Sequence, residues 1–135
     1  MDKKLNILMW LMMSALFGYF AYTKGWLVAN FQNVSIAEGK HLIDKDKNLT
    51  LVDVRSVSEY KRDCIASAIN IPFHELEQNL SKVLPFKATK ILIYSERGER
   101  GVKASRLLSN QGFVVSHLAG GVIFWIRQGY KVRKP

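Results

Sequence analysis

The sequence predicts an α/β protein in which a parallel sheet is flanked by helices and preceded by one transmembrane helix. Three observations predict this class. A long apolar stretch without charge opens the chain, short β-rich runs then alternate with helical stretches, and the clearest of these runs are apolar nearly throughout, as in strands buried on both faces of a sheet. The chain has 135 residues. About 100 remain after the apolar stretch, enough for one modest hydrophobic core.

The opening stretch is the first element. From Leu5 to Tyr22 no side chain is charged, and a helix of this length crosses most of a hydrocarbon core about 30 Å thick. We therefore assign residues 1–24 to a membrane anchor helix and expect a single-pass membrane protein. Trp26, together with Tyr19 and Tyr22, would form an aromatic belt at the far membrane interface.

Two other interpretations of this stretch stay open. Lys3 and Lys4 resemble the basic start of a cleaved signal peptide, although the apolar run is longer than a usual signal core and Tyr19 stands where a small residue is needed. A buried core helix is favoured least because the stretch has no polar face. Basic residues on the two sides nearly balance, so they do not fix the side of the membrane on which the domain lies; the short basic start slightly favours a domain outside the cytoplasm.

Residues 25–33 are expected to form a linker, residues 34–132 the soluble domain and residues 133–135 a basic tail. In the first half of the domain, caps and apolar runs predict a short strand at Val34 and Ser35, a helix from Ile36 to Ile43 capped by Ser35, and a strand from Leu49 to Val54. The capping box of Ser56 and Glu59 then begins a short helix. A strand from Ala68 to Ile71 follows, and Pro72 ends it.

The second half follows the same alternation. We predict helical turns from Phe73 to Leu84 that Pro85 breaks, a strand from Lys90 to Tyr94 centred on three successive aliphatic residues, a helix from Val102 to Asn110 that ends near Gly112, a strand from Phe113 to Leu118, a turn at Ala119-Gly120-Gly121 and a helix from Val122 to Arg127.

The segment between the strand and the helix in the middle of this half, Ser95 to Gly101, has a clear chemical logic. Consecutive backbone amides in such a loop, together with the positive end of the following helix, form a concavity suited to an anion. Arg97 and Arg100 add positive charge, and a nucleophile at the first position would be activated by the same field. We predict a binding site made of Ser95, Glu96, Arg97, Gly98, Glu99 and Arg100.

The domain resembles a single-domain rhodanese. The resemblance rests on Leu51-Val52-Asp53-Val54-Arg55, Glu59-Tyr60, Ala68-Ile69-Asn70-Ile71-Pro72, the loop with Gly98 and Arg100, Leu118-Ala119-Gly120-Gly121, Trp125 and Gly129-Tyr130, in that order. It implies a rhodanese-like fold with homology to sulfurtransferases. It also implies that Asp53, Arg55 and Glu59 are structural residues, which form buried ion pairs that fix the sheet and the following helix.

The loop departs from the family at its first position. The family's loop is usually Cys-x-x-Gly-x-Arg, and Ser95 stands in the place of the cysteine. Sulfurtransferases of this family hold the transferred sulfur as a persulfide on that cysteine, and a serine hydroxyl cannot form one. The comparison therefore implies a degenerate active site without a catalytic residue, in a domain that binds an anion or a partner. Residues 63–68 also depart from the family's Gly-His-Ile-x-Gly-Ala.

Two enzymatic alternatives stay open. Cys64, the one cysteine of the chain, or a cysteine of a partner protein could carry sulfur in place of the missing thiol. A free cysteine is, however, commonly a small buried apolar residue. Phosphatase chemistry, as in the phosphatase relatives of this fold, is less favoured because those enzymes also need the loop cysteine.

Composition argues against other functional classes. The formal charge of +9 is spread along the chain and no nucleic-acid motif accompanies it, so no nucleic-acid partner is expected. His41, His74 and His117 stand too far apart in the sequence to suggest a metal site, and we treat each as a surface or boundary residue. No cofactor is expected. The expected partners are the membrane and either a small anion or a protein, and the sequence does not indicate an oligomeric state.

Overall fold

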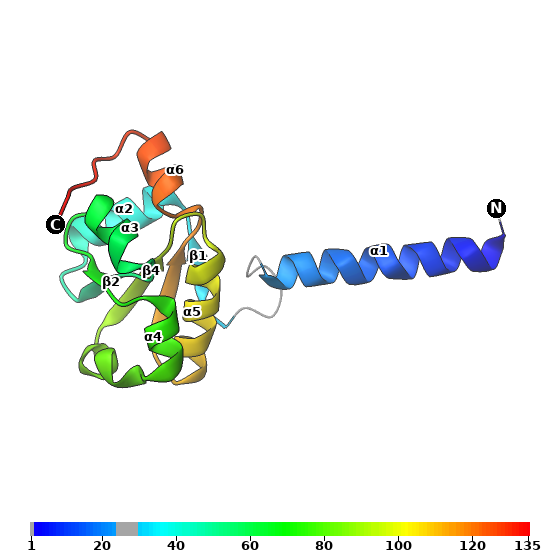
Figure 1. The fold of residues 1–135 in the computed structure, drawn as a ribbon, viewed down its shortest axis with the longest axis horizontal. Coiled ribbons are helices and arrows are strands. Elements are labelled where there is room, and N and C mark those ends of the chain that lie inside the picture. The colour runs from blue at the N-terminus through cyan, green and yellow to red at the C-terminus, as the bar shows by residue number, and fades with distance from the viewer. Residues whose placement is uncertain (1, 24–29) are drawn as a thin grey trace.

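The computed structural model describes residues 2–23 and 30–135 and consists of an α/β domain from which one helix projects (Figure 1). Trp26 and residues 25–29 of the predicted linker lie outside the described residues. The projecting helix, α1 (Lys3–Thr23), coincides with the predicted apolar helix.

Nearly all side chains of α1 are exposed. Among its described residues only Ala21 is buried, while Trp10 and Leu16 are about two-thirds exposed, at 65% and 67%. The helix is long and apolar enough to cross a membrane, a property that a signal sequence near an N-terminus shares. An apolar N-terminal helix is therefore present.

The domain is built on one five-stranded sheet with every pairing parallel, which confirms the predicted α/β class. The strand order is β1-β5-β4-β2-β3. The strands are β1 (Gln32–Val34), β2 (Leu49–Asp53), β3 (Ile69–Asn70), β4 (Lys90–Tyr94) and β5 (Val114–Leu118). β4 lies at the centre, so the segment that follows it leaves the sheet at the middle of its carboxyl edge.

Helices cover both faces of the sheet (Figure 1). Successive side chains of β4 point to opposite faces, so this strand contributes to two cores. Ile91 and Ile93 contribute to the core under α4 and α5, and Leu92 and Tyr94 contribute to the core under α2, α3 and α6. The helices are α2 (Ile36–Lys45), α3 (Val57–Arg62), α4 (Phe73–Gln78), α5 (Glu99–Asn110) and α6 (Gly121–Arg127), with 3₁₀ turns at Leu80–Lys82 and Leu84–Phe86.

Several boundaries differ from the predictions by a few residues, and three of these differences have a clear local reason. β1 begins earlier, at Gln32, and Ser35 is a helix cap in a capping box with Glu38 rather than a strand residue. α5 begins at Glu99 instead of Val102, because Gly98 adopts a φ of 131° that turns the chain directly into the helix. Pro85 does not end the helical turns, since it occupies the first turn of a 3₁₀ helix, where a proline is tolerated.

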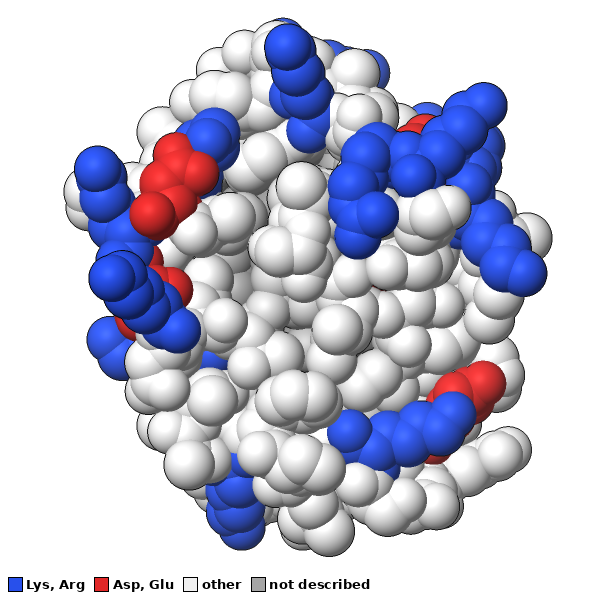
Figure 2. Space-filling view, turned by 90° about the vertical axis from the view of Figure 1, so that its left-hand side faces the viewer, with Lys and Arg blue, Asp and Glu red and all other residues white. Residues whose placement is uncertain are grey.

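Apart from residues such as the buried Asp53 and Arg55, charged side chains of the domain lie at its surface in scattered groups. Figure 2 shows the face directed away from α1, where lysines and arginines surround an uncharged centre and acidic residues lie between some of them.

Candidate functional site

The loop predicted as a binding site follows β4 and leads into α5, at the carboxyl edge of the sheet, where parallel α/β folds place their ligands. The start of α6 holds it from behind. The amide of Val122 donates to the carbonyl of Ser95 at 3.0 Å, and the amide of Ile123 donates to the carbonyl of Glu96 at 3.2 Å. A methyl group at Gly121 would collide with both carbonyls, so the predicted glycine turn is packed directly against the loop.

Ser95 points into the turn of the loop. Its residue is 1% exposed, and its Oγ accepts hydrogen bonds from the amides of Gly98 and Gly101, each at 3.1 Å. Two backbone donors thus converge on the side-chain atom at the first loop position. Such an arrangement stabilises negative charge on that atom, and the positive end of α5 adds to the effect.

Further amides at the start of α5 are open. The backbone N–H groups of Arg97, Glu99 and Arg100 donate to no acceptor within residues 2–23 and 30–135. They lie beside a pocket of about 270 Å³ lined by Ser95, Glu96, Arg97, Glu99 and Arg100. Five of the six predicted binding residues therefore line one pocket, and the sixth, Gly98, supplies an amide to Ser95 behind it. An anion is the ligand that unpaired amides at a helix start favour.

The side-chain charges of the loop are arranged differently from the expectation. Arg100 is engaged by Glu59 of α3, with Nη1 to Oε2 at 2.7 Å and Nη2 to Oε1 at 2.8 Å. The hydrogen bond from Arg100 lowers the pKa of Glu59 to about 2. Arg97 is exposed and forms no ion pair within the described part of the chain. Of the two cations predicted to add charge, therefore, only Arg97 is uncompensated.

Beneath the loop lies a buried ion pair. Arg55 and Asp53 are both inaccessible to solvent, and Arg55 donates to Asp53 from Nε at 3.1 Å and from Nη2 at 2.8 Å. Its Nη1 reaches Asp63 at 3.1 Å and Glu96 at 2.8 Å. Burial alone would lower the pKa of Arg55, but the hydrogen bonds and the charge of Asp53 raise it overall, so the guanidinium stays charged.

The structural trio is therefore divided in two. Asp53 and Arg55 form the expected buried pair, whereas Glu59 is only partly buried and pairs with Arg100. Glu59 thus differs from the expected buried ion pairing in being partly exposed, and its partner Arg100 lines the loop pocket. Glu59 also completes the predicted capping box, since its Oε2 accepts from the amide of Ser56 at 2.8 Å.

His117 lies behind the loop, a position that the sequence did not predict. It lies on β5, is 2% exposed, and its Nδ1 is 2.9 Å from Oδ1 of Asn33. Its Nε2 is buried and has no hydrogen-bond partner among the described residues. A methyl group built on Gly101 would stand 2.6 Å from this Nε2 and 3.2 Å from Oγ of Ser95, so the imidazole lies directly behind the loop. Burial lowers the pKa of His117 to about 4, which keeps the ring neutral near pH 7.

The register of the sheet explains the position of His117. Ile93 on β4 is paired with His117 on β5, so the histidine lies beside the strand end from which Ser95 continues. The interpretation of His117 as a surface or boundary residue is corrected accordingly.

Cys64 is buried and lacks the exposure and low pKa of a reactive thiol. Its side chain is 0% exposed, and burial raises its pKa, so the thiolate is disfavoured. Its backbone pairs with Arg133, with both N–H···O distances at 2.8 Å. Among residues 2–23 and 30–135, no group of histidine, cysteine, aspartate or glutamate side chains could hold a metal ion.

Comparison with known proteins identifies relatives of the domain. The chain is 30% identical over 115 residues to a thiosulfate:glutathione sulfurtransferase of Saccharomyces cerevisiae, covering 76% of this chain and 83% of that protein. It is 30% identical over 71 residues to the thiosulfate sulfurtransferase PspE of Escherichia coli, covering 53% and 68%. A match to tRNA uridine(34) hydroxylase of Buchnera aphidicola, 34% identical, covers 62% of this chain but 28% of that protein.

Solved structures agree with the sequence relatives. A rhodanese-related protein of Thermoplasma volcanium has a TM-score of 0.68 and 30% identity, covering 78% of this chain and all of that one. The family model of the rhodanese-like domain matches residues 35–128, from the cap of α2 to the end of α6. The chain therefore belongs to the rhodanese-like domain family, as the resemblance in its sequence predicted.

Proposed function

We propose that this protein is a membrane-anchored rhodanese-like domain that lacks sulfurtransferase activity and binds an anion or a partner through the loop from Ser95 to Arg100. The observation that carries the proposal is the environment of Oγ of Ser95, on which the amides of Gly98 and Gly101 converge. These backbone donors would stabilise negative charge on the side-chain atom at the first loop position, and in this chain that atom is the oxygen of a serine.

Oxygen changes the chemistry that this frame supports. Transfer from thiosulfate requires a thiolate to attack the outer sulfur, forming a new S–S bond while the old one breaks and sulfite leaves. A serine hydroxyl cannot form this bond. No carboxylate or imidazole within the described residues accepts a hydrogen bond from the Ser95 hydroxyl, so nothing there serves as its base.

Binding remains available to the same loop. The open amides of Arg97, Glu99 and Arg100 and the free guanidinium of Arg97 border a pocket of about 270 Å³. A small oxyanion, or an anionic group on a partner protein, would accept hydrogen bonds from these donors. Glu96 is paired with Arg55 and Arg62, so its charge is compensated. Glu99 on the rim forms no ion pair within the described residues, and its charge favours a ligand that presents a single anionic group.

The alternative is a sulfurtransferase that uses Cys64 or a partner's cysteine, and the names of the relatives favour it. For Cys64 it requires exposure of a thiol that is now buried and whose pKa is raised. The assay of thiosulfate-to-cyanide sulfur transfer separates the two functions. The full-length chain in detergent should show no turnover, with an active sulfurtransferase as the positive control. Turnover that is lost in Cys64→Ala would establish the alternative.

Membrane anchoring is supported by the exposed apolar surface of α1, which has no partner in the domain over most of its length (Figure 1). If α1 is an anchor, the mature chain keeps residues 1–24 and stays with membranes after washing with high salt and alkaline carbonate. If the stretch is a cleaved signal peptide, the mass of the mature chain will lack these residues and the domain will be released. Intact-mass measurement of the purified protein decides between them.

A further inference from the structure

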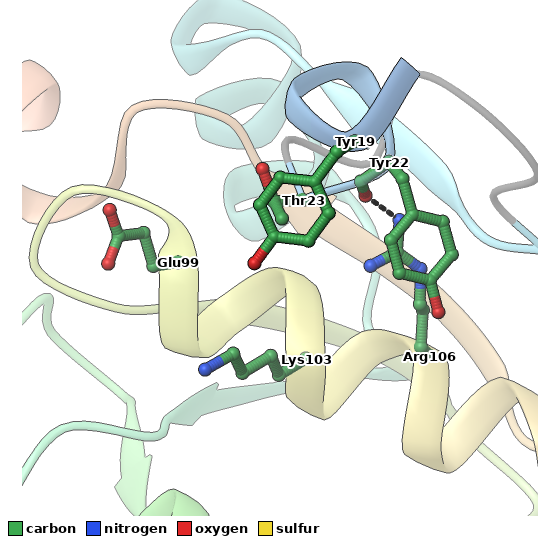
Figure 3. A pocket seen from close by; sticks show the side chains of 6 residues that line it. All are labelled: Tyr19, Tyr22, Thr23, Glu99, Lys103 and Arg106. Atoms are coloured by element: carbon green, nitrogen blue, oxygen red, sulfur yellow. Dashed lines mark hydrogen bonds between the residues drawn. The ribbon is translucent and has the colours of Figure 1, made fainter. Parts of the chain in front are cut away.

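The C-terminal end of α1 lies against α5 and encloses a second pocket there. Its walls come from Tyr19, Tyr22 and Thr23 of α1 and from Glu99, Lys103 and Arg106 of α5, and its volume is about 630 Å³ (Figure 3). Glu99 also borders the Ser95 loop, so the two pockets lie next to each other along α5. The chemistry of this second pocket differs from that of the loop, because two aromatic rings and two cations form it.

Contacts on both sides of residues 24–29 hold the end of α1 near α5. Before this segment, the guanidinium of Arg106 stacks on the ring of Tyr22, with Cζ 3.8 Å from the ring centroid, and donates a hydrogen bond to the carbonyl of Tyr22. After it, the hydroxyl of Ser109 donates to the carbonyl of Asn30 at 3.0 Å, and Asn30 also bonds Asn110. The pocket thus lies where the chain passes from the apolar helix to the domain.

The position of the pocket fits the headgroup layer of a membrane. If α1 spans the hydrocarbon core, its last turn, with Tyr19 and Tyr22, reaches the interface where tyrosine side chains concentrate. Lys103 is exposed and forms no ion pair within the described residues. Figure 3 shows Lys103 between Glu99 and Arg106, with the hydroxyl of Tyr19 above it. Basic side chains at this level attract anionic phospholipids.

We propose that this pocket binds the headgroup of an anionic phospholipid, with its phosphate between Lys103 and Arg106. The proposal rests on the membrane anchorage proposed above. Arg106 contributes positive charge, and its stacking on Tyr22 holds the end of α1 at the edge of the pocket. The ammonium group of Lys103 would donate hydrogen bonds to the phosphate. The phosphodiester carries one negative charge, which matches the two cations less the carboxylate of Glu99. A bound lipid would fix the domain against the membrane surface. The point of attachment at Lys103 would lie about one turn of α5 from the Ser95 loop.

The test uses the full chain in nanodiscs made of phosphatidylcholine alone or mixed with phosphatidylglycerol. Native mass spectrometry counts the lipid molecules that stay bound to the protein after it is released from the nanodisc. The wild type should retain phosphatidylglycerol in preference to phosphatidylcholine. Lys103→Gln should weaken this retention roughly fivefold, the effect of one cation near a membrane surface. Lys103 forms no other described contact, so this variant should fold normally.

Two matched variants give the test its direction. Glu99→Gln removes a negative charge from the same pocket and should strengthen phosphatidylglycerol retention. Lys47→Gln removes an exposed cation of the loop between α2 and β2 and should leave retention unchanged. Equal retention by Lys103→Gln and Lys47→Gln, or equal retention of the two lipids by the wild type, would overturn the proposal.

Two further outcomes separate the pocket from the anchor and from free anions. Displacement of the lipid by excess inorganic phosphate would show a site for a free anion and would overturn the lipid assignment. A chain that does not enter nanodiscs would refute the anchor itself. In that case dihexanoylphosphatidylglycerol, which is soluble, tests the pocket alone: an equal thermal shift in wild type and Lys103→Gln would refute it as well.

Discussion

Arg100 and Glu59 form a bidentate ion pair, with N–O distances of 2.7 and 2.8 Å, that joins the start of α5 to α3. The pair neutralises the arginine that the sequence assigns to the anion site. It also connects the binding loop to the short helix that follows β2, so the shape of the pocket depends on both elements.

Glu59→Gln should therefore strengthen anion binding while it weakens the fold. Removing the carboxylate leaves the guanidinium of Arg100 free to face an anion in the pocket. Because Arg100 is more than a third exposed, the loss of the pair should cost only about 0.5–1 kcal/mol of stability. Thermal unfolding across a sulfate titration measures both effects. The control is Glu75→Gln, which breaks the exposed Lys82 pair; an identical sulfate response in the two variants would contradict the role of Glu59.

His117 should make the stability of the domain depend on pH. Burial lowers its pKa from 6.5 to about 4, so the unfolded chain binds its proton more readily than the folded one. The contribution of the neutral His117 ring to the free energy of unfolding is fully present above pH 6.5. It is lost as the pH falls from 6.5 towards 4, by about 3 kcal/mol in total. Urea unfolding at a series of pH values should show a shallower slope over this range in His117→Asn than in His41→Asn, which removes an exposed histidine. Equal slopes would refute the assignment.

Gly101 should resist substitution because its missing side chain makes room for His117. A methyl group there would stand 2.6 Å from Nε2 of His117. Gly101→Ala should cost about 1–3 kcal/mol through overpacking, against the gain of about 1 kcal/mol that alanine normally brings to a helix. In a His117→Ala background the same change should be nearly neutral or stabilising. A double-mutant cycle by urea unfolding measures this coupling, and additive effects would show that the two residues do not compete for space.

The buried pair of Asp53 and Arg55 should be the most sensitive ion pair in the domain. Asp53→Asn leaves a guanidinium that is 0% exposed without its main carboxylate, which should cost about 3–5 kcal/mol. Replacing both residues, as in Asp53→Asn with Arg55→Met, should recover part of the loss because no buried charge is left unpaired. Denaturant unfolding compares the variants. A loss below about 1 kcal/mol for Asp53→Asn would indicate that the carboxylates of Asp63 and Glu96 compensate fully.

Much of the fold follows from local patterns in the sequence. The strand at Lys90–Tyr94, the helix cap at Ser35 and the capping box of Ser56 and Glu59 were predictable because apolar runs and caps act over a few neighbouring residues. The start of α5 was misplaced because its signal is a single glycine, Gly98, whose positive φ replaces a side-chain cap.

The partners within the site were not predictable in this way. Glu59 and Arg100 are far apart in the sequence and meet only because α3 and α5 begin at the same edge of the sheet. His117 reaches the loop through the register between β4 and β5, which its spacing from Ser95 does not reveal. Pairings of this kind depend on strand order and on helix placement, which single-residue patterns leave open.

We propose that the loop around Ser95 keeps the backbone donors that stabilise an anion and lacks only a thiolate. The most direct measurement is mass spectrometry of the chain after exposure to thiosulfate, in a Cys64→Ala background so that any thiol is the one introduced. With Ser95 in place no sulfur atom should be added. With Ser95→Cys, one sulfur atom should be gained as a persulfide, with release of sulfite. Sulfur uptake with Ser95 in place, or none with the cysteine in a folded protein, would contradict the account.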